Sequence, residues 1–89
     1  MSRALELSRA HAHWIEKNPL RSWRRGRAVP VTQATVAGVV HRSTQAIRDY
    51  EGGSYQPDGE VMVDIAGLLR LKPATLEQKW AAWLATRPT

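Results

Sequence analysis

The hydrophobic residues of the chain recur at three- and four-residue spacing and never alternate over a sustained stretch. This spacing places apolar side chains on one face of a helix, whereas a half-buried strand needs strict alternation. Proline and glycine interrupt the pattern repeatedly, at Pro19, Gly26, Pro30, Gly52-Gly53 and Pro73. The pattern therefore predicts an all-α fold, a compact bundle of five or six short helices in a single domain.

Capping residues and prolines predict where these helices begin. Thr32, Ser43 and Asp58 each precede an apolar stretch, and their side chains can accept a hydrogen bond from the first turn of a helix. Pro19 and Pro73 suit the first helical position, where no backbone N–H is needed. The first expected helix follows Ser2 up to Asn18, and Pro19 either interrupts it or opens another helix that Gly26 ends. The others cover 33–40, 44–51, a stretch from Asp58 that includes Leu69, and 73–86.

The charge of the chain is unevenly distributed. Its 89 residues hold 13 Lys and Arg against 8 Asp and Glu, a net charge of +5. Residues 1–48 carry +7, and residues 49–89 carry −2. Most of the basic residues are arginine, which favours planar anionic partners such as phosphate and guanine edges. A nucleic acid is therefore a candidate partner.

The sequence gives little support to other classes of function. There is no cysteine for a disulfide or a thiolate metal site. No apolar run approaches the roughly 18 residues of a membrane span, and the first residues do not form a secretory signal. His11 and His13 point in different directions on a helix, so no metal site is expected. No catalytic motif is present. We expect a cytoplasmic protein that is not an enzyme and has no cofactor, membrane association or small-molecule ligand.

Two adjacent helices carry the main functional pattern. The helices expected over 33–40 and 44–51 are too short to be stable alone, and the break between them is too short for antiparallel packing. They must therefore cross steeply, with Ala37, Val40 and Ile47 between them. This leaves the outer face of the second helix exposed, with the polar residues Thr44, Gln45, Arg48 and Asp49.

The stretch TQATVAGVVHRSTQAIRDYEGG, residues 32–53, resembles the helix-turn-helix of the phage-repressor/Cro family of xenobiotic-response-element-like regulators. The resemblance covers about residues 20–80. One departure lies in the turn, where His41-Arg42 replaces the usual glycine and apolar residue, so His41 is expected to adopt φ > 0. The matching positions are Thr32-Gln33, Val36-Ala37, Val40, Ser43, Ile47, Tyr50, Glu51, Gly53, Pro57, Ile65-Ala66 and Leu69.

The resemblance implies a role for each matching position. It divides the chain into an N-terminal extension (1–18), a helix-turn-helix core (19–72) and a C-terminal helix (73–86). Thr44, Gln45 and Asp49 match positions that touch DNA bases, and Arg48 could take a phosphate or a guanine. The expected phosphate contacts are Gln33, Arg42, Ser43, Gly53, Ser54 and Tyr55, joined by the basic residues Arg24, Arg25 and Arg27.

The segment Arg25-Gly26-Arg27 leaves three alternatives open. An Arg-Gly-Arg hook can enter the narrow minor groove of AT-rich DNA. The same arginines could instead face phosphates, or they could form a solvated loop without any DNA contact.

Four tryptophans are many for a chain of this length. Each ring can bury some 150–250 Å², so burial in the core is the simplest explanation. A second explanation is an apolar patch for another copy of the chain. We expect a homodimer that uses Trp80, Trp83 and Leu84, with or without the first helix.

These observations predict a sequence-specific regulator of transcription that binds double-stranded DNA, a phage or bacterial repressor that recognises an inverted repeat as a dimer. One alternative is a protein-interaction module on the same fold, such as an antitoxin or a phage factor that binds a host protein. Another is an architectural or excision protein that bends DNA.

Overall fold

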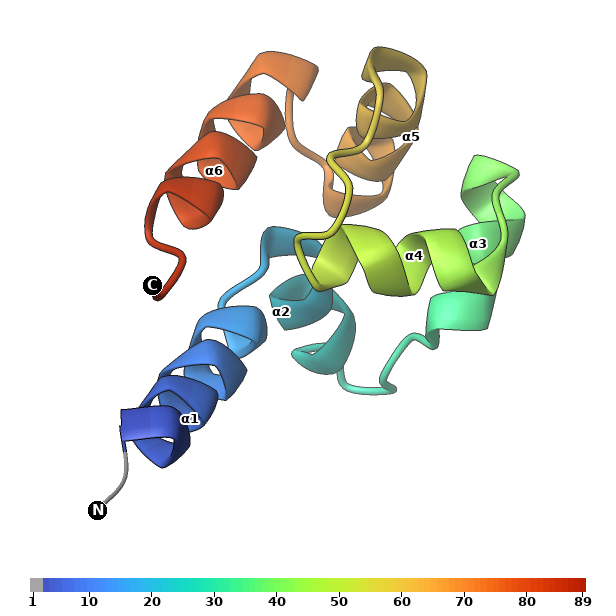
Figure 1. Cartoon of the computed structure of the whole chain (residues 1–89). Coiled ribbons are helices and arrows are strands. Elements are labelled where there is room, and N and C mark those ends of the chain that lie inside the picture. Colours follow the sequence, from blue (N-terminus) through green and yellow to red (C-terminus); the bar gives the residue numbers. More distant parts are fainter. Residues whose placement is uncertain (1–2) are drawn as a thin grey trace.

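In the computed structural model, which describes residues 3–89, these residues form six α-helices and no strand (Figure 1). The prediction of an all-helical chain with five or six short helices is therefore confirmed. Ser2, the expected cap of the first helix, lies outside the described residues. The helices are α1 (Arg3–Glu16), α2 (Pro19–Arg25), α3 (Gln33–Val40), α4 (Thr44–Glu51), α5 (Gly59–Leu69) and α6 (Pro73–Ala85).

Side-chain caps fix the beginnings of four helices. The side chains of Thr32, Ser43 and Asp58 accept hydrogen bonds from the first turns of α3, α4 and α5, as the sequence predicts. Asn18 caps α2, and its Oδ1 accepts from the backbone N–H groups of Leu20 and Arg21. Asn18 is fully buried, so this cap also closes the short break between α1 and α2.

The connection between α3 and α4 turns on a left-handed residue. His41 ends α3 with φ 55° and ψ 46°, and its N–H donates to the carbonyl of Ala37. The N–H of Arg42 donates to the same carbonyl at 3.0 Å. The sequence-based expectation of φ > 0 at His41 is thus confirmed, although glycine would adopt this conformation at lower cost.

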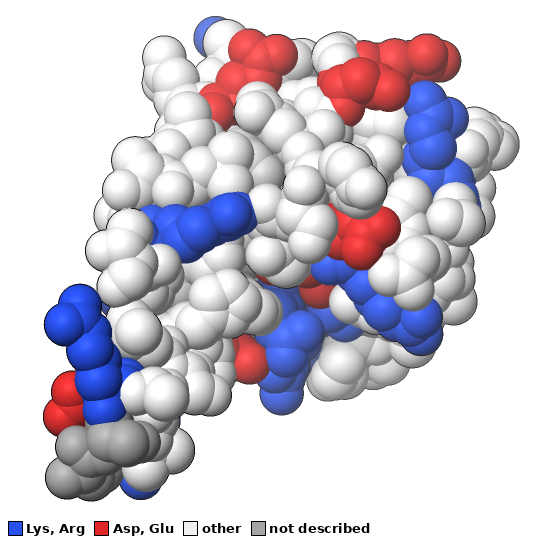
Figure 2. Space-filling view, viewed as in Figure 1, with Lys and Arg blue, Asp and Glu red and all other residues white. Residues whose placement is uncertain are grey.

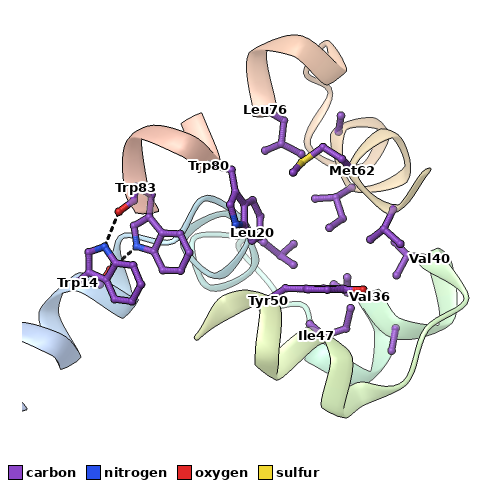
Figure 3. Close-up of a cluster of buried hydrophobic side chains, with 14 residues drawn as sticks. Trp14, Leu20, Val36, Val40, Ile47, Tyr50, Met62, Leu76, Trp80 and Trp83 are labelled. Carbon is purple, nitrogen blue, oxygen red and sulfur yellow. Dashed lines mark hydrogen bonds between the residues drawn. The ribbon is translucent and has the colours of Figure 1, made fainter. Parts of the chain in front are cut away.

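One hydrophobic core lies where all six helices meet (Figure 3). Trp80 is fully buried at its centre, and its ring meets that of Trp83 edge to face at 5.8 Å. The remaining buried apolar side chains come from every helix and include Leu20, Val36, Ala37, Val40, Ile47, Tyr50, Val61, Met62, Ile65, Ala66 and Leu76.

Two tryptophans join the first helix to the last. The rings of Trp14 and Trp83 stack with their centroids 4.1 Å apart and their planes 4° from parallel. Each indole N–H donates to the backbone carbonyl of the other residue, at 2.6 and 2.8 Å (Figure 3).

These contacts correct the expected dimer interface. Trp80 and Trp83 are 0% and 5% exposed within a single chain, because α1, α2 and α5 cover the inner face of α6. They are therefore not available to a second copy. Leu84 is half-buried and packs against the same core.

The molecule measures 42 × 26 × 24 Å, and its long axis follows from α1, which extends away from the other helices (Figure 1). On α1, residues 3–13 are exposed, and burial begins at Trp14. Among the described residues, none of the helices has the length and the apolar character needed to cross a membrane.

Candidate nucleic-acid interface

The α3–α4 pair forms the base of the candidate site. Val36, Ala37 and Val40 of α3 pack inward with Ile47 and Tyr50 of α4, and all five side chains are at most 9% exposed. Figure 1 shows α4 lying across the end of the molecule that α3 occupies. Because one face of α4 is fixed in the core, its other face is presented to solvent in a defined orientation.

That outer face carries the polar residues that the sequence singles out. Gln45 and Arg48 are exposed, and Thr44 and Asp49 are half-buried. Gln45 Nε2 donates to Asp49 Oδ1 at 3.0 Å, one turn further along the helix. Arg48 Nη1 donates to Gln45 Oε1 at 3.3 Å. The three side chains therefore form one hydrogen-bonded chain with Gln45 in the middle.

This chain fixes the orientation of the Gln45 amide. Its oxygen meets the cationic donor of Arg48, and its nitrogen meets the carboxylate acceptor of Asp49. The reverse orientation would place like atoms together on both sides. A glutamine amide offers two N–H donors and two acceptor lone pairs. One N–H and one lone pair of Gln45 remain for a partner.

The turn before α4 holds two further predicted site residues. The Ser43 hydroxyl caps α4 by accepting from the N–H of Ala46 at 3.0 Å, so its lone pairs are partly used. Arg42 reaches Asp58 at 3.5 Å and also donates to the carbonyl of His41. The Asp58 carboxylate has its pKa lowered, first by the backbone N–H of Val61 and then by Arg42. Both groups of this pair stay charged at neutral pH.

A buried ion pair lies beneath the site. Glu51, at the end of α4, is 2% exposed, and Arg24 of α2 binds both of its carboxylate oxygens at 2.7 and 2.8 Å. Arg24 also donates to the carbonyl of Val31 at 3.0 Å. Gln33 Nε2, at the start of α3, donates to Glu51 Oε1 at 3.1 Å. This network connects α2, α3 and α4.

The network corrects the expected role of Arg24. Its side chain is 8% exposed, and its guanidinium is committed to Glu51 and Val31, so it is not free to meet a phosphate. Gln33 remains half-buried beside the exposed start of α3. Its side chain is held by Glu51, which places it at the surface in a fixed position.

The other arginines of this segment remain accessible. Arg25 is exposed and pairs with the exposed Glu16 at 3.1 Å. Arg27 is also exposed, and its guanidinium lies 5.0 Å from the centre of the Trp23 ring. An open hollow of about 360 Å³ separates α2 from the start of α3, lined by Arg21, Arg24, Arg25, Pro30, Val31, Thr32 and Gln33. Arg27 therefore rests on α2 in this structure, and the loop does not extend as a free hook.

The loop after α4 uses most of its backbone groups internally. The N–H groups of Ser54 and Tyr55 both donate to the carbonyl of Asp49. Gly53 adopts φ 78°, its N–H donates to Tyr50, and its carbonyl accepts from the Arg87 side chain. The side chains of Ser54 and Tyr55 remain exposed, as does that of Gln56.

Arg87 and Glu51 were not identified from the sequence as partners of the site. Arg87 lies over the Trp14 ring at 4.9 Å and holds the loop at Gly53. Nothing in the local sequence indicates that Glu51, at the end of α4, is buried, because its partner Arg24 lies on another helix. The run of arginines in α2 was the one sequence signal for a buried ion pair, because one of them, Arg24, faces inward.

Charged side chains of both signs lie on the surface of the molecule. Figure 2 shows Asp and Glu side chains at the upper edge of the drawn face, in the region of α5 and α6, and others lower down among the Lys and Arg side chains. Within residues 3–89, no three His, Asp or Glu side chains are grouped so that they could hold a metal ion.

Comparison with family models, with curated proteins and with solved structures gave no match to this chain.

Proposed function

We propose that the chain is a sequence-specific DNA-binding regulator of the phage-repressor/Cro type, with α4 as the helix that reads bases. The observation that carries the proposal is the outward face of α4, where Gln45 is oriented by Arg48 and Asp49 and still has one donor and one acceptor free. An α-helix that exposes such groups fits the major groove of B-DNA.

The free groups of Gln45 match one base better than the others. Adenine presents an acceptor at N7 and a donor at N6 in the major groove, and a glutamine amide can bind both together. Gln45 has that pair of groups available, with its plane already fixed by its neighbours. Fixing the amide in advance reduces the ordering cost of binding.

Phosphate contacts would position α4 on the duplex. The accessible candidates are Gln33 at the start of α3, Arg25 in the hollow next to it, Arg27 over the Trp23 ring, and Ser54 and Tyr55 after α4. Arg42 can also turn from Asp58 towards a phosphate, because the exposed ion pair between them is weak. These contacts supply affinity without sequence preference.

A homodimer on an inverted repeat is part of this proposal. Two copies related by a two-fold axis would present their α4 helices about 34 Å apart, one turn of the DNA helix. Because Trp80 and Trp83 are buried, the contact between copies must use other residues. Repression suits a chain of this kind, because blocking a promoter needs no further surface.

Selection of bound duplexes from random DNA at a fixed salt concentration tests the proposal. The wild-type chain should select a palindromic motif, and Gln45→Ala should relax the preference at one base pair of each half-site. The expected loss of discrimination there is about 1–3 kcal/mol. Gln78→Ala, which removes the same side chain from the exposed face of α6, is the matched control. Unchanged preferences in Gln45→Ala would exclude α4 as the reading helix.

A further inference from the structure

An open apolar groove lies on the α2 and α6 side of the molecule, lined by residues outside the proposed reading face. Its volume is about 560 Å³. Its apolar lining comes from Pro19, Trp23, Leu69, Leu71 and Ala82. The only charged side chains that line it are Lys17 and Lys79, and both are exposed.

The two lysines give the groove a preference for a negatively charged occupant. Among the described residues, neither Lys17 nor Lys79 is within ion-pair distance of a carboxylate. An apolar surface bordered by unpaired positive charge is complementary to an apolar surface that carries carboxylates.

The outer face of α5 provides such a surface. We define the acidic stripe as Glu60, Val63, Asp64 and Gly67, which lie at positions i, i+3, i+4 and i+7 of the helix and are all exposed. Val63 is 52% exposed, and no ion pair to either carboxylate occurs within residues 3–89. This spacing is the one by which a helix docks one face into a groove.

Gly67 is consistent with a close neighbour outside the chain. A Cβ built on Gly67 meets nothing within 4 Å, so packing inside the chain does not require glycine there. Glycine in the middle of a helix is less stable than alanine. Its absence of a side chain lets another surface approach the backbone of α5 beside Val63.

We propose that the groove of one copy binds the acidic stripe of α5 of a second copy. Other surfaces of the chain are less suitable: two grooves facing each other would bring their four lysines together. The exposed part of α1 carries Leu7, but it also carries Arg3 and Arg9 against one glutamate, Glu6. The acidic stripe offers the opposite charge together with an exposed apolar side chain.

The contact is heterologous, because the groove and the acidic stripe are different surfaces. A bound pair therefore leaves one groove and one acidic stripe unused, and further copies can add. The contact does not depend on DNA binding, since none of its residues lies on α3 or α4. Its exposed ion pairs make it weak and sensitive to salt.

Sedimentation of the full chain without DNA tests this proposal. At about 50 mM salt, the average mass should keep rising beyond a dimer as the concentration increases from about 10 µM to about 1 mM, and about 500 mM salt should suppress the rise. A mass that stays at a monomer or stops at a closed dimer across this range would overturn the proposal.

Charge reversal identifies the two surfaces. A groove variant (Lys17→Glu with Lys79→Glu) and a stripe variant (Glu60→Lys with Asp64→Lys) should each lose the rise. An equimolar mixture of the two should regain it, because every groove then finds a stripe of opposite charge. All four side chains are exposed, so both variants should keep the helical circular dichroism of the wild type.

Glu77→Lys, an exposed charge reversal on α6 outside the groove lining, serves as the control and should leave the rise intact. A mixture that fails to associate would overturn the proposal, as would either variant that associates like the wild type. Since DNA is absent, these outcomes are independent of the Gln45 experiment.

Discussion

His41 holds the turn between α3 and α4 in a conformation that suits glycine. Its φ of 55° and ψ of 46° lie in the left-handed region, which costs a residue with a Cβ about 1–2 kcal/mol. His41→Gly should therefore raise the free energy of unfolding by about 0.5–1 kcal/mol, since glycine also loses more entropy on folding. Urea unfolding followed by circular dichroism measures this. His41→Ala, which keeps the Cβ, should give no gain.

Arg24 was expected to contact a phosphate, but it forms a buried ion pair instead. Its guanidinium binds both oxygens of the buried Glu51, so Arg24→Met would leave that carboxylate with only Arg21, whose Nη1 lies 3.9 Å from Oε1. The expected loss is about 3–5 kcal/mol in the free energy of unfolding. Arg25→Met, which breaks a solvent-exposed pair with Glu16, should cost less than about 1 kcal/mol. Equal losses in urea unfolding would contradict the buried network.

Individual caps could be predicted, whereas individual ion pairs could not. Ser43 bonds the N–H of Ala46, three residues away, so the sequence itself holds both partners. Glu51 meets Arg24, 27 residues away, and three neighbouring arginines offered the same chemistry. Only the packing of α2 on α4 decides which arginine faces inward.

At the scale of elements, Trp14 fixes the orientation of α1. It is the only buried residue of that helix and bonds Trp83 through both the indole and the backbone. Trp14→Ala should cost about 3–5 kcal/mol, as loss of a buried aromatic does. Hydrogen exchange of the α1 amides should then become fast, because a helix of this length is unstable without packing. Trp14→Phe keeps part of the packing, so its loss of stability and its α1 exchange rates should lie between those of the wild type and Trp14→Ala.

If α1 stayed protected from exchange in Trp14→Ala, a contact other than the tryptophan pair would have to hold it. The comparison should use amides of α4 as an internal reference. Those amides exchange through opening of the core around Ile47, to which α1 contributes only Trp14 and part of Ile15.

The helices themselves followed from local signals, but the neighbours of each helix did not. Prolines at Pro19 and Pro73 and the caps before α3, α4 and α5 set the boundaries within a few residues. The face of α6 that becomes covered depends on where α1 and α2 pack. For this reason the prediction of an exposed patch at Trp80 and Trp83 was wrong. The apolar face of α6 was identified correctly, but it packs against helices of the same chain and not against a second copy.

At the scale of the whole molecule, the positive charge available to DNA is smaller than the arginine count suggests. Arg21 and Arg25 share Glu16, Arg24 is paired with Glu51, and Arg42 is paired with Asp58. Each exposed pair must open before its arginine can replace a counterion on a phosphate. The long-range field therefore comes mainly from cations without a carboxylate partner, such as Arg27 and Arg48.

The salt dependence of DNA binding measures how many of these cations reach phosphates. Each phosphate neutralised by a cation adds about 0.9 to the magnitude of the slope of log K against log salt, so Arg25, Arg27 and Arg42 together predict a slope of about −2.7 per chain. Arg27→Ala should reduce the magnitude of that slope by about one, and Lys79→Ala, on the groove side, should leave it unchanged. Arg24→Met should keep the full slope wherever the variant remains folded, because its guanidinium is already committed to Glu51. Fluorescence anisotropy across a salt series gives all three slopes. A smaller slope magnitude in Arg24→Met would mean that the buried Arg24–Glu51 pair opens on DNA and that Arg24 contacts a phosphate.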